Sequence, residues 1–203
     1  MPLLRGKQHE RAGSLKKENI VMNIQQLHSI YQLKVQLKGI KPPIWRRLLI
    51  RNSMSLAELH HVIQIAMGWE DAHIHQFVKE GSYYGLSEDM QYELDYRVSQ
   101  LLRHEQDSLL YEYDFGDGWQ HDVILEKILA FKPDQSLPIC IAGNRACPPE
   151  DIGGIPGYAM CLQALADPDN PANEEYLEFV VEDFLPESFC LDVVNEDLLE
   201  IQI

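Results

Sequence analysis

The sequence predicts a single α+β domain, in which an antiparallel or mixed sheet carries helices packed on one face. Two observations support this fold class. Apolar residues recur at every second position in several segments, which is the period of strands with one buried face. One long segment instead has apolar residues at helical spacing. The chain has 203 residues, of which 45% are hydrophobic, and this is enough for one buried core.

The first two strands are predicted on either side of a proline turn. Residues 31–37 alternate apolar and polar side chains, which predicts a half-buried strand. Pro42 and Pro43 then make a stiff turn. Residues 44–50 are predicted to form the second strand.

A helix is predicted to begin after Ser55. Glu58 follows three residues later, which is the spacing of a capping box. Apolar side chains then recur every three or four residues as far as Gly68, which supplies the stop. His60 and His61 occupy successive positions, so at most one of them faces the core squarely.

The middle of the chain predicts short elements. Residues 73–79 and 82–86 are predicted strands, and residues 95–103 are a predicted short helix. His73 and His75 would then lie on one face of the first of these strands, because side chains two residues apart share a face.

The strongest strand pair joins residues 109–115 to residues 119–128. A three-residue loop with Gly118 in the left-handed conformation would pair Phe115 with Trp119. A two-residue loop is the alternative, and it would move the register by one residue.

The hydrophobic pattern selects between these registers. The three-residue loop places Tyr113 opposite His121 on an almost wholly apolar face, whereas the two-residue loop places Asp114 opposite His121. We therefore expect the three-residue loop. Its disadvantage is that Glu112 lies opposite Asp122, which is a like-charge pair.

Residues 138–158 are predicted to form a loop without a regular element, because they contain four prolines and four glycines. Residues 157–166 are predicted to form a helix that buries Cys161 as a small hydrophobic residue. Cys140 and Cys147 are separated by six residues, which is a poor spacing for structural zinc.

Charge is distributed unevenly along the chain, whose net charge is −15. Residues 146–203 carry 14 acids and no Lys or Arg. We expect residues 1–29 to form a mobile N-terminal arm, and residues 30–203 to form the α+β domain with an acidic C-terminal third. The negative field repels phosphate backbones and anionic lipids, which argues against general nucleic-acid binding and membrane binding.

One segment of the body is densely basic and contains Lys38, Lys41, Arg46, Arg47 and Arg51. This basic cluster could contact phosphates, with Trp45 stacking on a base. Alternatively it pairs with the acidic C-terminal third, which needs no partner molecule. We expect the second arrangement because it matches the charge asymmetry.

Location is predicted from the termini and the cysteines. The first 20 residues lack an apolar leader, and no apolar run approaches the roughly 20 residues of a membrane span. These features predict a cytoplasmic protein whose four cysteines are reduced thiols.

Four motifs follow one another along the chain: PPIWRRLLI, ELHHVIQIAMGWEDAHIHQF, YEYDFGDGWQHDVILEKI and CPPEDIGGIPGY. With them the sequence resembles the plasmid Ri "open reading frame three"-like family, from about residue 31 to residue 199. The resemblance implies an α+β domain, and members of this family occur on plasmids and in insertion elements. It implies no catalytic residue.

Carboxylates and imidazoles gather in and beside the third motif. Asp114, Asp117 and His121 are the candidate catalytic residues. With His73 and His75 they are also the candidate ligands of a divalent metal such as zinc, manganese or iron. The alternative is a tight hairpin whose acidic residues make local hydrogen bonds.

A ligand cleft is the broader hypothesis. It would be formed by the DFGDGWQH hairpin, the strand with the two histidines and the CPPEDIGG loop. Its candidate residues are Trp45, His60, Trp69, His73, His75, Tyr113, Trp119, Glu150 and Asp151.

The sequence favours a cytoplasmic binding or interaction module with an unknown protein partner, serving plasmids or insertion elements as an accessory protein. A metal-dependent hydrolase or nuclease-like enzyme is the alternative. A third hypothesis is an acidic protein that occupies basic surfaces of a DNA-handling partner. Convergence of the candidate ligands within metal-binding distance would favour the enzyme, and their scatter would favour the binding module. The oligomeric state stays open.

Overall fold

The computed structural model describes residues 29–173, 177 and 184–201. Apart from residue 29, the predicted arm lies outside these residues. The strands are β1 (Ser29–Leu37), β2 (Trp45–Arg51), β3 (His75–Lys79), β4 (Ser82–Gly85), β5 (Gln91–Tyr92), β6 (Ser108–Tyr113), β7 (Trp119–Ala130) and β8 (Ile139–Asn144). The helices are α2 (Leu56–Met67), α3 (Val98–Leu101), α4 (Gly154–Ala166) and α6 (Leu191–Glu200), with 3₁₀ turns η1 (Glu93–Asp95) and η2 (Pro171–Asn173).

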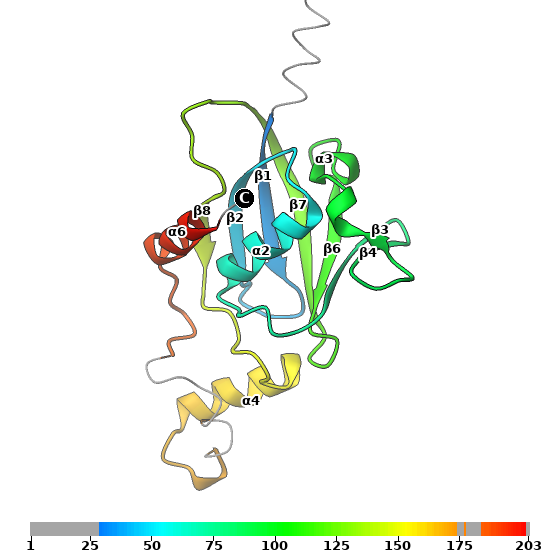
Figure 1. Cartoon of the computed structure of the whole chain (residues 1–203). Coiled ribbons are helices and arrows are strands. Elements are labelled where there is room, and N and C mark those ends of the chain that lie inside the picture. The colour runs from blue at the N-terminus through cyan, green and yellow to red at the C-terminus, as the bar shows by residue number, and fades with distance from the viewer. Residues whose placement is uncertain (1–28, 174–176, 178–183, 202–203) are drawn as a thin grey trace, which may run out of the picture.

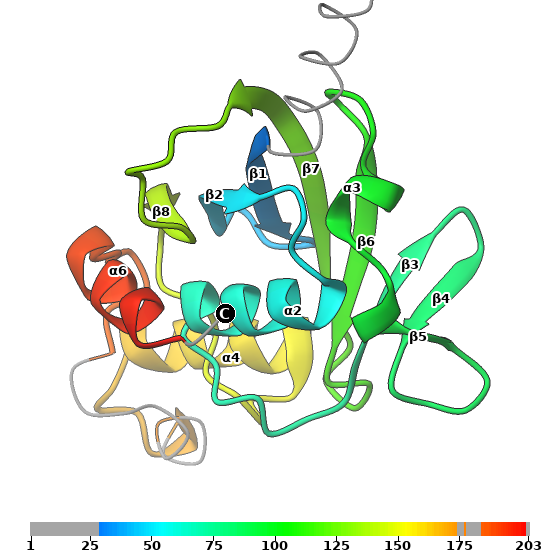
Figure 2. The same cartoon turned by 45° about the horizontal axis from the view of Figure 1, so that its top comes forward.

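The described strands form one eight-stranded sheet in the order β5-β4-β3-β6-β7-β1-β2-β8 (Figure 1). Neighbouring strands are antiparallel except for the parallel pair of β4 and β5, so the sheet is mixed. Helix α2 lies across one face of the sheet, and α6 contacts both α2 and β8 (Figure 2). The predicted fold class, a single α+β domain, is confirmed.

Strand β1 buries one apolar face in the core. Tyr31, Leu33, Val35 and Leu37 are buried in the core, as the alternating pattern predicts. Strand β1 pairs with β2 on one side and with β7 on the other.

Helix α2 begins and ends where the sequence predicts. The Glu58 carboxylate accepts a hydrogen bond from the Ser55 backbone N–H at 2.6 Å, and Ser55 Oγ accepts from the Glu58 N–H at 3.2 Å. This is the complete capping box. Gly68 ends the helix in the left-handed conformation at φ 85°.

The predicted register of the β6–β7 hairpin is wrong by two residues. Tyr113 pairs with Trp119, and Tyr111 pairs with His121. A shift of two residues keeps every side chain on its predicted face. It also brings Gln120 opposite Glu112, where Gln120 Nε2 donates to Glu112 Oε1 at 2.7 Å. The like-charge pair of the predicted register is thereby avoided.

A longer loop explains the shift. Asp114 takes the left-handed conformation at φ 52° and ends the strand, and its Oδ1 accepts hydrogen bonds from the Gly116 and Asp117 N–H groups at 2.9 and 3.2 Å. Gly118 is left-handed as predicted, at φ 70°. The loop therefore spans residues 114–118, because an aspartate turn precedes the glycine.

The prediction that residues 138–158 contain no regular element is also wrong. They include strand β8, which pairs with β2 at the edge of the sheet, and the start of α4 at Gly154. Pro138 comes just before β8, and an edge strand tolerates proline at its start. Pro156 lies in the first turn of α4, where a backbone N–H has no partner within the helix.

Among the described residues, the basic cluster makes no ion pair with the acidic C-terminal third, contrary to the prediction. Arg47 makes two hydrogen bonds to Glu126 of β7 at 2.6 and 2.8 Å, and Lys38 lies 3.5 Å from Asp122. Arg46 is buried, and its Nε donates to the carbonyl of Ala66 at 2.7 Å. The acids that Arg47 and Lys38 contact lie on β7, far from both bases in the sequence, so the linear charge distribution does not reveal them.

One contact between the body and the C-terminal segment involves a base outside the cluster. Arg145 Nη2 lies 2.8 Å from Glu187, and the guanidinium of Arg46 stacks over the Phe189 ring at 4.4 Å. Cys161 is fully buried in α4, as predicted. Within the described part of the chain, no helix combines the length and apolar character needed to cross a membrane.

We expect the Gly154→Ala variant to be strongly destabilised. Gly154 has φ 67°, and a Cβ there would lie 2.4 Å from the Asp117 carbonyl oxygen. The left-handed conformation alone costs an alanine about 1–2 kcal/mol, and the clash with backbone adds to it. Urea unfolding followed by tryptophan fluorescence should therefore show a loss of more than about 2 kcal/mol.

Gly118→Ala is the matched control for this variant. Gly118 is also left-handed, at φ 70°, but no atom lies within 4 Å of the added Cβ. The Gly118→Ala variant should lose only about 1 kcal/mol of its free energy of unfolding. Equal losses for the two variants would contradict the close contact between the hairpin loop and α4.

Candidate functional site

A small pocket of about 340 Å³ opens between α2, the segment that follows it, β3 and η1. Its size suits one small molecule or one long side chain. The lining is polar at several positions and apolar at others. The lining residues are Ala57, His60, His61, Asp71, His73, Ile74, His75, Leu86, Ser87, Glu93 and Leu94.

A closed ring of four hydrogen bonds holds Asp71 beside this pocket. The Asp71 N–H donates to Gln64 Oε1 at 3.2 Å, and Gln64 Nε2 donates to the Tyr111 oxygen at 2.8 Å. Tyr111 Oη and His60 Nδ1 are 2.8 Å apart, and His60 Nε2 lies 2.8 Å from Asp71 Oδ1. We call this set of residues the Asp71 ring.

The ring fixes the protonation of His60. Because Gln64 donates to Tyr111, the phenol proton has His60 Nδ1 as its acceptor, so His60 carries its own proton on Nε2 and donates it to Asp71. Burial, followed by the charge of His75, lowers the pKa of His60 to about 3. Burial also raises the pKa of Tyr111 well above its usual value, so the phenol keeps its proton.

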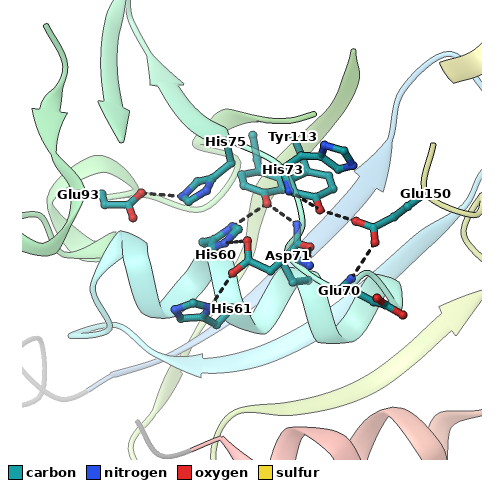
Figure 3. Close-up of polar contacts among 11 residues, drawn as sticks. His60, His61, Glu70, Asp71, His73, His75, Glu93, Tyr113 and Glu150 are labelled. Atoms are coloured by element: carbon teal, nitrogen blue, oxygen red, sulfur yellow. Dashed lines mark hydrogen bonds and ion pairs between the residues drawn. The ribbon is translucent and has the colours of Figure 1, made fainter. Parts of the chain in front are cut away.

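His75 and Glu93 form a second buried pair at the pocket. His75 Nε2 lies 2.8 Å from Glu93 Oε2, and Glu93 is only 2% exposed. The His75 ring stacks on His60 with centroids 3.4 Å apart and planes 5° apart. Figure 3 shows Glu93 and Asp71 on opposite sides of the two stacked rings.

A separate group lies beside the pocket, where three loops meet. His73 Nε2 lies 3.2 Å from Asp151 Oδ1 and 3.7 Å from Asp114 Oδ2. This nitrogen is buried and has no hydrogen-bond partner among the described residues. One ligand atom from each of the three residues lies within 4.8 Å of the others, which is close enough for a shared metal ion.

Hydrogen bonds join the hairpin loop to the loop before α4. Asp117 Oδ2 accepts from the Gly153 N–H at 3.1 Å. The Tyr113 hydroxyl donates to Glu150, and Glu150 also accepts from the Glu70 N–H at 3.2 Å (Figure 3). Burial, followed by the hydrogen bond to Glu150 and its charge, raises the pKa of Tyr113. These contacts hold Asp114 and Asp151 next to His73.

The sequence is similar to known proteins over most of its length. The family model described as plasmid pRiA4b ORF-3-like protein matches residues 29–193. The chain belongs to this family. An uncharacterised protein of Sinorhizobium fredii, y4hQ, is 36% identical over 157 residues, which cover 74% of this chain and 80% of that protein.

A crystal structure shows the same fold in another organism. The protein of unknown function MM3350 from Methanosarcina mazei matches with a TM-score of 0.76 and 36% identity, covering 82% of this chain and 97% of that one. The resemblance drawn from the four motifs is thus confirmed, and the relatives carry no assigned activity in their names.

In this member of the pRiA4b ORF-3-like family, the candidate metal ligands do not form one site. His73 lies in the loop before β3 and not in the strand, so the prediction that it shares a strand face with His75 is wrong. The His73 side chain lies beside Asp114 and Asp151, whereas the His75 side chain contacts Glu93 and stacks on His60. His121 is fully buried in the core, where its Nδ1 faces the Tyr111 carbonyl at 3.4 Å. The Asp117 carboxylate accepts a hydrogen bond from the backbone N–H of Gly153.

The predicted cleft residues are similarly divided. Trp69 is buried, donates from Nε1 to the Pro148 carbonyl at 2.9 Å, and stacks on Tyr113. Trp119 is buried in the core. Trp45 lies on β2 under the cationic groups of Lys34 and Arg47, away from the pocket lining. His60, His73 and His75 line the pocket, whereas Glu150 and Asp151 adjoin it.

Sequence reasoning missed Asp71, Gln64 and Glu93. The signal for Gln64 was its spacing from His60, because residues four apart on a helix share a face. As predicted for neighbouring histidines, His60 is buried and His61 is exposed. Asp71 and Glu93 come from short connecting segments, whose positions depend on the tertiary fold and leave no periodic signal.

We expect stability to fall as the pH drops below about 6.5, because His60 and His121 are held neutral. Burial lowers the pKa of both to about 3. The unfolded chain takes up protons near pH 6.5 and the folded chain does not. Stabilisation that is complete above pH 6.5 is therefore lost towards pH 3, at about 1.4 kcal/mol per pH unit for each histidine.

The His121→Leu variant removes the proton that this histidine takes up on unfolding. Urea unfolding between pH 6 and pH 4.5 should show a slope lower than wild type by about 1.4 kcal/mol per pH unit. The exposed His104→Asn variant should keep the wild-type slope. An unchanged slope in His121→Leu would mean that the buried ring is already protonated in the folded protein.

Proposed function

We propose that the protein is an interaction module whose pocket receives a Lys or Arg side chain of a partner protein. The observation that carries the proposal is the composition of the pocket, which combines carboxylates in its interior with apolar side chains around it. A basic side chain has the complementary structure, with a cationic head on an apolar stem.

The interior of the pocket supplies acceptors for a cation. The Asp71 carboxylate is held by His60 Nε2 at 2.8 Å, and the buried Glu93 carboxylate is held by His75 at the same distance. Because both groups are already fixed by partners, little side-chain entropy is lost when a ligand binds. Charge-assisted hydrogen bonds to them would be stronger than neutral ones.

The apolar lining residues are unusually exposed. Ile74, Leu86 and Leu94 have exposed fractions of 66%, 68% and 46%. Exposed apolar side chains grouped around a pocket are typical of protein interaction sites. They would cover the stem of the inserted side chain and the surface around it.

The net charge supports a basic partner. At −15 the chain attracts positively charged proteins over long range and repels polyanions. The family takes its description from a plasmid reading frame. This supports a role as a cytoplasmic accessory protein of plasmids or insertion elements, with general nucleic-acid binding disfavoured.

A metal-dependent hydrolase or nuclease-like enzyme is the second candidate function. The group of His73, Asp114 and Asp151 favours it, because a metal ion held there would activate water. The ligands that the sequence predicts do not all meet at one point, since His121 is in the core and His75 faces Glu93. The interaction module is therefore the better supported function.

We expect the pocket to select small probes by the charge of their head group. NMR titration of the full chain with n-butylguanidinium and n-butylammonium should give saturable shifts at Asp71, Ile74, His75 and Leu94. n-Butanol should bind more weakly, and butyrate should cause no shift at these positions. The Asp71→Asn variant should bind the cations about tenfold more weakly, the equivalent of one charge-assisted hydrogen bond.

We expect Asp71→Asn to preserve the structure around the pocket. The asparagine carbonyl still accepts from His60, and asparagine tolerates the left-handed conformation that Asp71 takes at φ 58°. Glu70→Gln is the matched control, because it removes one adjacent charge outside the pocket lining and should keep wild-type affinity. Binding of butyrate as tight as that of butylammonium, or unchanged affinity in Asp71→Asn, would reject the proposal.

A further inference from the structure

We propose that His73, Asp114 and Asp151 bind one divalent metal ion of the zinc or manganese type. This metal site adjoins the pocket, and it does not rest on the proposal that the pocket binds basic side chains. Its three residues come from three separate segments: the loop before β3, the β6–β7 hairpin and the loop before α4.

The distances between the ligand atoms suit a metal ion better than a hydrogen bond. Around a tetrahedral ion with bonds of about 2.0–2.2 Å, neighbouring ligand atoms lie about 3.4 Å apart. His73 Nε2 lies 3.2 Å from one carboxylate and 3.7 Å from the other. A charge-assisted hydrogen bond would bring one oxygen to about 2.7–2.9 Å.

The His73 nitrogen is the second observation that points to a ligand. It is buried, it faces two carboxylates, and it makes a hydrogen bond to neither. Buried polar atoms without partners are uncommon, and each one calls for a physical explanation. A metal ion between the nitrogen and the two oxygens satisfies all three atoms.

The surrounding hydrogen bonds orient the ligands. Asp114 Oδ1 accepts from the Gly116 and Asp117 N–H groups, and its Oδ2 is the oxygen nearer to His73. The His73 backbone N–H donates to the Tyr113 hydroxyl at 3.3 Å. Such outer contacts hold ligands in place and raise metal affinity.

The neighbouring group of His60, Asp71 and His75 also has ligand atoms within 4.8 Å of one another. Its ring nitrogens, however, already have hydrogen-bond partners. His60 Nε2 donates its proton to Asp71, and His75 Nε2 contacts Glu93. In addition, the two rings are stacked with planes 5° apart and centroids 3.4 Å apart, so their lone pairs lie in separate parallel planes, and a single ion cannot lie in the plane of both rings.

The donor set defines the class of metal. One imidazole and two carboxylates suit zinc, manganese or ferrous iron, and two carboxylates balance the charge of a divalent ion. The Asp151 side chain is 71% exposed, so an ion there can exchange with solvent and keep water in its remaining positions.

The test uses the full chain purified without a polyhistidine tag and treated with EDTA. Isothermal titration with zinc chloride and with manganese chloride should show one ion bound per chain for at least one of them. That ion should raise the melting temperature of the protein, because it binds the folded state only.

Three variants assign the ion to this site. Asp151→Asn and His73→Gln should weaken binding at least about 100-fold, since even outer-contact changes cost 10–100-fold. Asp71→Asn, in the neighbouring group, keeps an acceptor for His60 and its own backbone N–H for Gln64, so the ring and His73 should stay in place and the variant should bind the ion as wild type does. Asp151→Asn alters an exposed side chain in a loop, so its folding should be intact, which circular dichroism will check.

Two results would overturn the metal site. One is the absence of stoichiometric zinc or manganese binding by folded wild-type protein. The other is loss of the ion in Asp71→Asn with retention in Asp151→Asn. Because Asp151→Asn should still bind n-butylammonium, the metal site and the pocket proposal can fail separately.

Discussion

The Asp71 ring is the constraint on which both candidate sites depend. It links α2 through His60 and Gln64, β6 through Tyr111, and the segment after α2 through Asp71. Each polar group in it has a defined donor or acceptor, and burial makes such a fully satisfied network expensive to break. The ring therefore fixes a short connecting segment that would otherwise have little to hold it, and places Asp71 at the pocket two residues before His73.

The second fixed region is the junction between the β6–β7 hairpin loop and the start of α4. Asp117 binds the Gly153 N–H, and the absence of a side chain at Gly154 lets the two backbones touch. This junction brings Asp114 and Asp151 together, and the Asp71 ring brings His73 to them. All three aspartates, Asp71, Asp114 and Asp151, take the left-handed conformation, at φ 58°, 52° and 57°. Strained backbone of this kind persists only where surrounding contacts determine it.

The parts of the fold that follow periodicity could be predicted from the sequence, namely the alternating strand β1 and the capped helix α2. The hairpin register could not be predicted, because Asp114 ends β6 with a turn in which its side chain binds the following backbone. In the sequence, this aspartate cannot be told from any other acidic residue.

The candidate site was predicted in part. The meeting of His73 with the hairpin and the CPPEDIGG loop agrees with the expected cleft, whereas the burial of His121 and the roles of Asp71 and Glu93 depend on tertiary contacts. The linear charge distribution also misassigned the partner of Arg47, because its acid, Glu126, lies on β7, on the far side of β1 in the sheet.

The protonation of His60 is the most direct test of the Asp71 ring. Long-range ¹H–¹⁵N correlation spectra of the histidine side chains report both the tautomer and the charge of each ring. We expect His60 to be neutral, with its proton on Nε2, from pH 7 down to pH 5, because burial lowers its pKa to about 3. A His60 ring that titrates near its ordinary pKa of about 6.5, or that carries its proton on Nδ1, would contradict the Asp71 ring and the positions of both sites derived from it.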